Sequence, residues 1–204
     1  MRYCFLFVLL IFTATFARAD ERPVLVLGDS LSAAYHIDAD AGWVALLAQR
    51  LKNSHPPIAV VNASISGETT AGGLARLPAL LTQHKPGTVV VELGANDGLR
   101  GLPLDQIRTN LNAIIKTSGD AGAKVVLLGI ELPVNYGTQY RVGLRDMYRD
   151  AAKEFNVPLV PFLLDGVALD PKLMQDDGLH PVAAGEPKVL DNVWPTLKGA
   201  IGLK

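Results

Sequence analysis

Cysteine is almost absent from this sequence of 204 residues: the only one, Cys4, lies inside the apolar run that opens the chain. If that run is removed, the protein has neither disulfide nor thiol chemistry, even in an oxidising compartment. An excess of one charge sign is also lacking, since 19 lysines and arginines stand against 20 aspartates and glutamates without a basic cluster. This balance argues against nucleic acid as a partner.

Several motifs that mark common enzyme classes are missing as well. The chain has no Gly-x-Ser-x-Gly elbow, which argues against the ordinary α/β-hydrolase fold. It has neither a Walker lysine motif nor a dinucleotide-binding Gly-x-Gly-x-x-Gly. No cluster of histidine, cysteine and glutamate suggests a metal site, so we expect neither a metal nor another cofactor.

Residues 1–19 have the pattern of a secretory signal peptide. Arg2 precedes an apolar run over residues 4–16, and small residues then occupy the two positions that a signal peptidase reads, Ala17 and Ala19. The alternative is an uncleaved membrane anchor, but the run is shorter than the roughly 20 residues that cross a bilayer. We therefore expect cleavage after Ala19, a periplasmic or secreted protein, and no stable membrane anchor on the remaining chain.

Short apolar runs alternate with amphipathic stretches along residues 20–204. Strands are predicted over residues 24–27, 58–61, 88–93, 124–130 and 158–162. Helices are predicted over residues 42–53, 70–83, 103–118, about 138–155 and 181–201. The strand runs are continuously apolar, as in parallel sheets that are covered on both faces. Because no linker, repeat or low-complexity tract interrupts the pattern, we predict one α/β domain, a three-layer α/β/α sandwich around a mostly parallel five-stranded sheet.

Three short polar stretches follow predicted strands, at residues 28–30, 66–68 and 94–97. The ends of parallel strands share one edge of the sheet, so we expect these stretches to converge. Gly28 permits a sharp turn from strand to loop, which would leave Ser30 exposed at that edge. A serine in that position becomes a nucleophile only if a base and oxyanion donors meet it.

The polar stretches contain suitable donors for a developing negative charge. Gly67 offers a backbone N–H that no side chain obstructs, and Asn96 offers a side-chain NH₂ group. Two or three such donors around the Ser30 hydroxyl would form an oxyanion hole. Simpler interpretations also exist: the turn at residues 28–30 is compatible with an anion nest of the flavodoxin type, and Asn96 with a helix cap. Other polar residues nearby are expected to fix loops or to pack: Ser32, Ser64, Ser66, Glu68 and Asp97.

The base must be one of four histidines. His36, His55 and His84 lie in or beside polar loops without an obvious carboxylate partner, and we expect them at the surface. His180 differs, because Asp177 precedes it by three residues. A carboxylate at that spacing can bind the imidazole Nδ1–H and leave Nε2 free as a general base. The simpler interpretation of this pair is a carboxylate near the N-terminus of a helix.

Taken in this order, the polar segments resemble the four blocks of the SGNH (GDSL) hydrolases. The blocks lie at residues 28–31, at Gly67, at Gly94-x-Asn96-Asp97 and at Asp177-x-x-His180. The similarity continues through residues 62–67, 73–81, 96–101, 132–137 and 174–181, and it is strongest to the bacterial periplasmic thioesterase I, lysophospholipase and arylesterase group. Ala34 and Ala95 depart from this pattern, because close relatives usually have glycine there.

The resemblance implies a flavodoxin-like serine hydrolase with Ser30 as nucleophile, Asp177 and His180 as its partners, and Ser30 N–H, Gly67 N–H and Asn96 as oxyanion donors. It also implies acyl esters and thioesters as substrates, including aryl and alkyl esters, acyl-CoA and lysophospholipids. Two alternatives remain open, namely a carbohydrate O-deacetylase on the same fold and a non-catalytic periplasmic binding protein. A loop after the fourth strand is expected to flank an acyl groove, through Leu132, Pro133, Asn135 and Tyr136.

Overall fold

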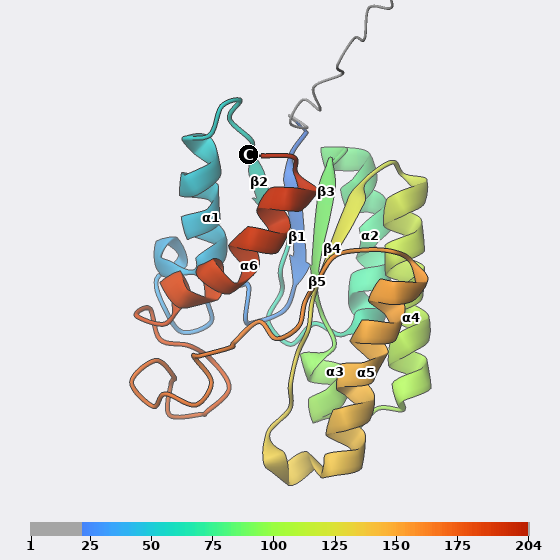
Figure 1. The fold of residues 1–204 in the computed structure, drawn as a ribbon, viewed down its shortest axis with the longest axis vertical. Helices are drawn as coiled ribbons and strands as arrows, with labels where there is room; N and C mark the ends of the chain where they lie inside the picture. The colour runs from blue at the N-terminus through green and yellow to red at the C-terminus, as the bar shows by residue number, and fades with distance from the viewer. Residues whose placement is uncertain (1–21, 204) are drawn as a thin grey trace, which may run out of the picture.

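The fold is given by a computed structural model that describes residues 22–203, so the predicted signal peptide lies outside the described residues. The strands are β1 (Val24–Gly28), β2 (Val60–Asn62), β3 (Thr88–Glu92), β4 (Lys124–Leu128) and β5 (Leu159–Val160). They form one sheet in the order β2-β1-β3-β4-β5, and every neighbouring pair is parallel (Figure 1). All carboxyl ends of the strands therefore lie at the same edge of the sheet, which is the lower edge in Figure 1.

Helices cover both faces of this sheet. The helices are α1 (Trp43–Lys52), α2 (Thr70–His84), α3 (Ala95–Leu99), α4 (Leu104–Asp120), α5 (Thr138–Glu154) and α6 (Glu186–Ala200), with short 3-10 turns η1 (Ala39–Ala41) and η2 (Val134–Tyr136). Figure 1 shows α1 and α6 on one side of the sheet and α2, α4 and α5 on the other. The predicted three-layer α/β/α class is thus confirmed. Within residues 22–203, no helix has the length and apolarity that a bilayer crossing requires.

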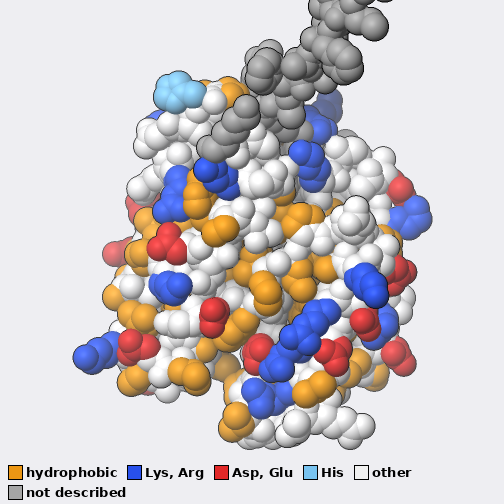
Figure 2. Space-filling model, in the orientation of Figure 1, with side chains coloured by type: hydrophobic (Ala, Val, Ile, Leu, Met, Phe, Trp, Pro, Cys, Tyr) orange, Lys and Arg blue, Asp and Glu red, His pale blue; other side chains and the backbone are white. Residues whose placement is uncertain are grey.

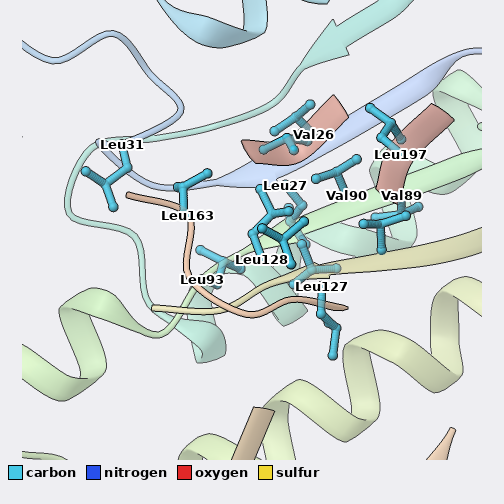
Figure 3. Packing of buried hydrophobic residues seen from close by; sticks show 14 of the residues in the cluster. Val26, Leu27, Leu31, Val89, Val90, Leu93, Leu127, Leu128, Leu163 and Leu197 are labelled. Atoms are coloured by element: carbon cyan, nitrogen blue, oxygen red, sulfur yellow. The ribbon is translucent and has the colours of Figure 1, made fainter. Parts of the chain in front are cut away.

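The core lies between the sheet and its two helical layers. Every residue of β1 and β3 is buried, as the apolar runs at the centre of both strands predict, and in β3 the polar end residues Thr88 and Glu92 are buried as well. Val26 and Val90 pair in register and share one face of the sheet, whereas Leu27 points to the other face; all three belong to the cluster of buried residues drawn in Figure 3. Burying one such side chain contributes roughly 1.5–3 kcal/mol to stability. The central strands therefore form a rigid base for the loops at the sheet edge.

The surface between α5 and α6 mixes charged and apolar side chains. Figure 2 shows this face, where lysines and arginines alternate with aspartates and glutamates around groups of hydrophobic side chains. No single charge sign dominates the visible face, so it produces no strong field of one sign.

The observed strands and most helices begin and end within two residues of the predicted bounds, but two helical segments differ more. The last helix begins at Glu186 rather than at residue 181, because Pro181 forms an antiparallel bridge with Met174 and because Pro187 occupies the first turn of α6. The segment at residues 95–99 forms a separate short helix, α3, that the sequence did not predict. Gly94 precedes it with φ of 119°, a left-handed conformation that favours glycine.

A buried carboxylate joins the first residues of α6 and α1. Glu186 is 2% exposed, and its Oε2 accepts a hydrogen bond of 2.8 Å from the N–H of Trp43, the first residue of α1. Burial raises the pKa of Glu186 to about 7. This hydrogen bond holds the first residue of α6 against the first residue of α1. It thereby also fixes the end of the loop that precedes α6.

Candidate active site

Ser30 lies where β1 ends at the carboxyl edge of the sheet. The chain turns sharply after Gly28, where a Cβ atom would come within 2.8 Å of the side chains of Ser32 and Ser64. The carbonyl of Asp29 then accepts the N–H groups of Ser32 and Ala33, which closes the turn. Because a side chain at this position would collide with Ser32 and Ser64, the start of the turn requires glycine.

A hydrogen-bonded chain runs from Ser30 to Asp177. Ser30 Oγ lies 2.8 Å from His180 Nε2, and His180 Nδ1 lies 2.7 Å from Asp177 Oδ2. If Nδ1 carries the ring proton, it donates to the carboxylate, and Nε2 accepts the serine hydroxyl. The structure thus brings together the three residues that the sequence singled out, and in this geometry His180 can take the proton of Ser30.

Asp177 is held by the backbone of its own loop. Its Oδ1 accepts the N–H groups of Leu179 at 2.8 Å and of His180 at 3.1 Å. Although partial burial opposes the effect, these hydrogen bonds and the His180 ring together lower the pKa of Asp177. The carboxylate therefore stays ionised at neutral pH, and it can orient the imidazole and stabilise it when protonated.

Each of the three predicted oxyanion donors keeps an N–H group that no hydrogen bond occupies in the described part of the chain, and Asn96 lines the same cavity as Ser30. Within residues 22–203, the backbone N–H groups of Ser30 and Gly67 donate to no other group. Gly67 has φ of 80°, and the space where its Cβ would stand is open. Asn96 donates one N–H to Asp29 Oδ2 at 2.9 Å, which leaves its second N–H free. Asn96 is not a helix cap, because Gly94 occupies the N-cap position of α3.

Neighbouring polar residues hold the surrounding loops, as predicted. Asp97 accepts hydrogen bonds from the N–H and the hydroxyl of Thr70, and Glu68 forms an ion pair of 2.7 Å with Arg76. Ser32 donates to a buried carboxylate, that of Glu92. These hydrogen bonds hold the loops beside the site in place. The carboxylate oxygens of Asp97 and Glu68 already accept hydrogen bonds from other groups.

The remaining histidines form no hydrogen bond with the nucleophile in the described part of the chain. His36 and His55 are exposed and His84 is half-buried. His36 stacks on Tyr35 with 3.8 Å between ring centroids, and the centroid of Tyr35 lies 4.5 Å from that of His180. Tyr35 is a site residue that sequence reasoning missed, because nothing in its immediate sequence pairs it with residue 180.

A cavity of about 200 Å³ opens beside Ser30 and His180. Its wall is mostly apolar and comes from the ends of several strands and the loops that follow: Leu31, Ala95, Leu99, Ile130, Leu132, Pro133, Phe162, Leu164 and Leu179. Leu132 and Pro133 were predicted at this groove. Asn135 is exposed and Tyr136 lies outside the wall, although its hydroxyl donates to the Leu99 carbonyl at 3.1 Å.

The described residues offer no obvious metal site. Within residues 22–203, no group of three or more histidine, cysteine, aspartate and glutamate side chains is arranged to hold a metal ion. Ser30 is hydrogen-bonded to an imidazole and shares its cavity with the amide of Asn96, and both groups are suited to acyl transfer.

Residues 26–186 match the GDSL-like Lipase/Acylhydrolase family. The chain is 51% identical over 181 residues to the esterase TesA of Pseudomonas aeruginosa, a match covering 89% of this chain and 90% of that protein. It is 48% identical over 187 residues to the thioesterase 1/protease 1/lysophospholipase L1 of Escherichia coli, covering 92% of this chain and 87% of that protein.

Solved structures show the same similarity. The crystal structure of TesA has 51% sequence identity and a TM-score of 0.85, covering 88% of this chain and 99% of that chain. The crystal structure of the psychrotrophic esterase EstA from Pseudoalteromonas sp., inhibited by monoethylphosphonate, has 41% identity and a TM-score of 0.84. That match covers 88% of this chain and 98% of that chain.

Proposed function

Because the chain belongs to the GDSL-like lipase/acylhydrolase family, we propose that it is a serine esterase and thioesterase working through an acyl-enzyme on Ser30. The observation that carries the proposal is the hydrogen-bonded chain Ser30–His180–Asp177 at the mouth of an apolar cavity. The names of similar proteins support it, since they include an esterase, a thioesterase and an arylesterase.

The geometry suggests the order of proton transfers. His180 Nε2 takes the proton of Ser30 as Oγ attacks the carbonyl carbon, and the carbonyl oxygen becomes an oxyanion. The N–H groups of Ser30 and Gly67 and the free N–H of Asn96 stabilise this charge. His180 then gives its proton to the departing alcohol or thiol. Water, activated by the same imidazole, attacks the acyl-enzyme and releases the carboxylic acid.

The cavity supports a fatty-acyl chain as the group transferred. Its wall presents branched and aromatic side chains, and the carboxylate of Glu131 is the one acidic group that lines it. A buried CH₂ group is worth about 0.8 kcal/mol, or roughly a fourfold change in rate. We therefore propose esters and thioesters of fatty acids as the substrates, with lysophospholipids among them, as the name of the Escherichia coli relative indicates.

A series of nitrophenyl esters tests this substrate class. From the acetyl ester upwards, kcat/KM should rise up to about fourfold per CH₂ until the cavity is full, and then level off. Leu99→Trp should lower kcat/KM for an octanoyl ester by about tenfold or more because the larger ring occupies the cavity, while the acetyl ester changes by less than about threefold.

Val134→Trp is the matched control, since Val134 is 79% exposed and lies outside the cavity wall. It should leave both esters unaffected. An acetyl ester that is hydrolysed faster than every longer ester would contradict the acyl cavity and would favour a carbohydrate O-deacetylase instead.

We also propose that the protein is exported and that residues 1–19 are removed. The support is the apolar run over residues 4–16 with Ala17 and Ala19 after it. In a Gram-negative host, mass spectrometry of the periplasmic fraction should show a chain that begins at Asp20. A membrane-bound protein that still carries Met1 would show that the segment is an anchor.

A further inference from the structure

Two buried carboxyl groups lie beneath Ser30 that the reaction above does not use. Asp29 directly precedes the serine, and Glu92 is the last residue of β3, where it pairs in register with Gly28. Both side chains have zero exposure. Among residues 22–203, no lysine or arginine forms an ion pair with either carboxyl group. Such a pair is costly to bury, so its retention here calls for a physical reason.

The contacts of Glu92 fit a carboxylic acid better than a carboxylate. Its Oε2 accepts the hydroxyl of Ser32 at 2.8 Å and the N–H of Asp29 at 3.2 Å. Its Oε1 is fully buried and has no donor within reach. An ionised oxygen in that position would be unsolvated, whereas protonation removes the charge. A protonated Glu92 also has a hydrogen to donate in the side-chain hydrogen bond that it shares with Asp29. Burial, together with the charge of Asp29, raises the pKa of Glu92 well above its ordinary value.

The contacts of Asp29 fit an anion. Its Oδ1 accepts the N–H of Leu31 at 3.0 Å, and its Oδ2 accepts the side-chain N–H of Asn96 at 2.9 Å. Burial raises the pKa of Asp29 to about 6, while hydrogen bonds from Leu31, Glu92 and Asn96 oppose the rise. At neutral pH the two carboxyl groups therefore hold one proton between them, and it resides on Glu92.

An ionised Asp29 dictates how the Asn96 amide is turned. A carboxylate only accepts hydrogen bonds, so Asn96 must present its NH₂ group and not its carbonyl oxygen to Asp29. The second N–H of the same planar group is then fixed in direction. The other ionisable groups around the pair are His180, Asp97 and Tyr148; the last donates its hydroxyl to the Leu93 carbonyl at 2.6 Å.

We propose that Asp29 and Glu92 form a carboxyl pair with one shared proton, and that this pair positions the Asn96 carboxamide as an oxyanion donor. This positioning role rests on the proposed function, because Asn96 acts as an oxyanion donor only if the protein catalyses acyl transfer. Asp29 is the positioning residue, and the neutral Glu92 allows Asp29 to remain ionised beside it without a counter-ion.

A double-mutant cycle tests the positioning role. Asp29→Asn replaces the anion with an amide that no longer dictates the orientation of Asn96, so kcat should fall by about tenfold or more while KM changes by less than about threefold. In an Asn96→Ala background the same substitution should change kcat by less than about twofold, because its effect passes through Asn96. Circular dichroism of each variant establishes that it is folded.

The outcomes separate this inference from the proposed function. If Asn96→Ala is slow but Asp29→Asn costs the same factor in both backgrounds, the positioning role is overturned and the proposed function stands. A folded Asn96→Ala variant with normal kcat would also overturn the positioning role and leave the proposed function standing, whereas a wild type that hydrolyses no ester would overturn the proposed function itself.

Glu92→Gln tests the shared proton independently of activity, since glutamine keeps a donor towards Asp29 but does not ionise. A folded-state pKa above the unfolded value of 4.5 means that Glu92 contributes stability below that pH and loses it as the pH rises towards the folded-state pKa. The melting temperature of the wild type should therefore fall relative to Glu92→Gln as the pH increases above about 4.5. Glu92→Gln should also lower kcat less than Asp29→Asn does. Melting temperatures that stay parallel from pH 4.5 to about 9 would overturn the shared proton.

Discussion

Replacement of His180 by alanine is expected to lower kcat for a nitrophenyl ester by about 10⁴-fold to 10⁶-fold. Nε2 of this residue is 2.8 Å from Ser30 Oγ, and within residues 22–203 no other base is placed to take the serine proton. Without it, the hydroxyl remains a weak nucleophile. The measurement is the rate of nitrophenol release, corrected for hydrolysis in buffer, on a variant shown by circular dichroism to be folded.

The other histidines are the matched controls. His36→Ala, His55→Ala and His84→Ala should each retain kcat within about threefold of the wild type. His36 is the most stringent of these, because it stacks on Tyr35, which in turn contacts the ring of His180. Wild-type turnover by His180→Ala would refute the proposed triad, as would a loss in one of the controls as large as that in His180→Ala.

Replacement of Asn96 by alanine should lower kcat by roughly 10² to 10³, or about 3–4 kcal/mol in the activation barrier, and should leave KM nearly unchanged. The free N–H of Asn96 acts mainly on the oxyanion, so its loss affects the transition state more than the bound ester. Asn96→Asp should be at least as slow, because a second carboxylate would then adjoin that of Asp29 and repel the developing charge.

Stability must be measured on the same Asn96 variants. Alanine leaves Asp29 Oδ2 without the donor it has at 2.9 Å, and an unsatisfied buried acceptor costs about 1–3 kcal/mol. A lower melting temperature is therefore expected beside the lower kcat. A folded Asn96→Ala variant whose kcat is near normal would show that this residue serves stability alone.

The sheet and the convergence of the site were predictable from local patterns. Continuously apolar runs identified the central strands, because strands buried on both faces need no polar residues. Parallel strands end at one edge, so the positions of Ser30 and Asn96 after predicted strands were enough to group them, and both line one cavity. The same argument predicts Gly67 beside them. The spacing of Asp177 and His180 allowed a local contact, which the structure contains at 2.7 Å.

Other features depend on contacts between distant segments. Glu92 is the only acidic residue in its apolar run, and its burial against Asp29 results from the register of β3 with β1. The cavity wall combines Leu99 with Phe162 and Leu164, whose proximity depends on how the segments after two strands, β3 and β5, fold back. The start of α6 shifted by five residues because the bridge of Pro181 to Met174 competes with helix formation. No local pattern carries this information.

The hydrogen bond between Ser30 and His180 joins residues 150 positions apart in the chain. The serine follows the first strand of the sheet, whereas the histidine comes after the last one. Contacts between residues so distant in sequence require that most of the intervening chain is already ordered. A partly synthesised or partly folded chain therefore possesses its hydroxyl group without any base to activate it. Reactivity arises only when the final loop docks, so hydrolysis reports completion of the whole fold.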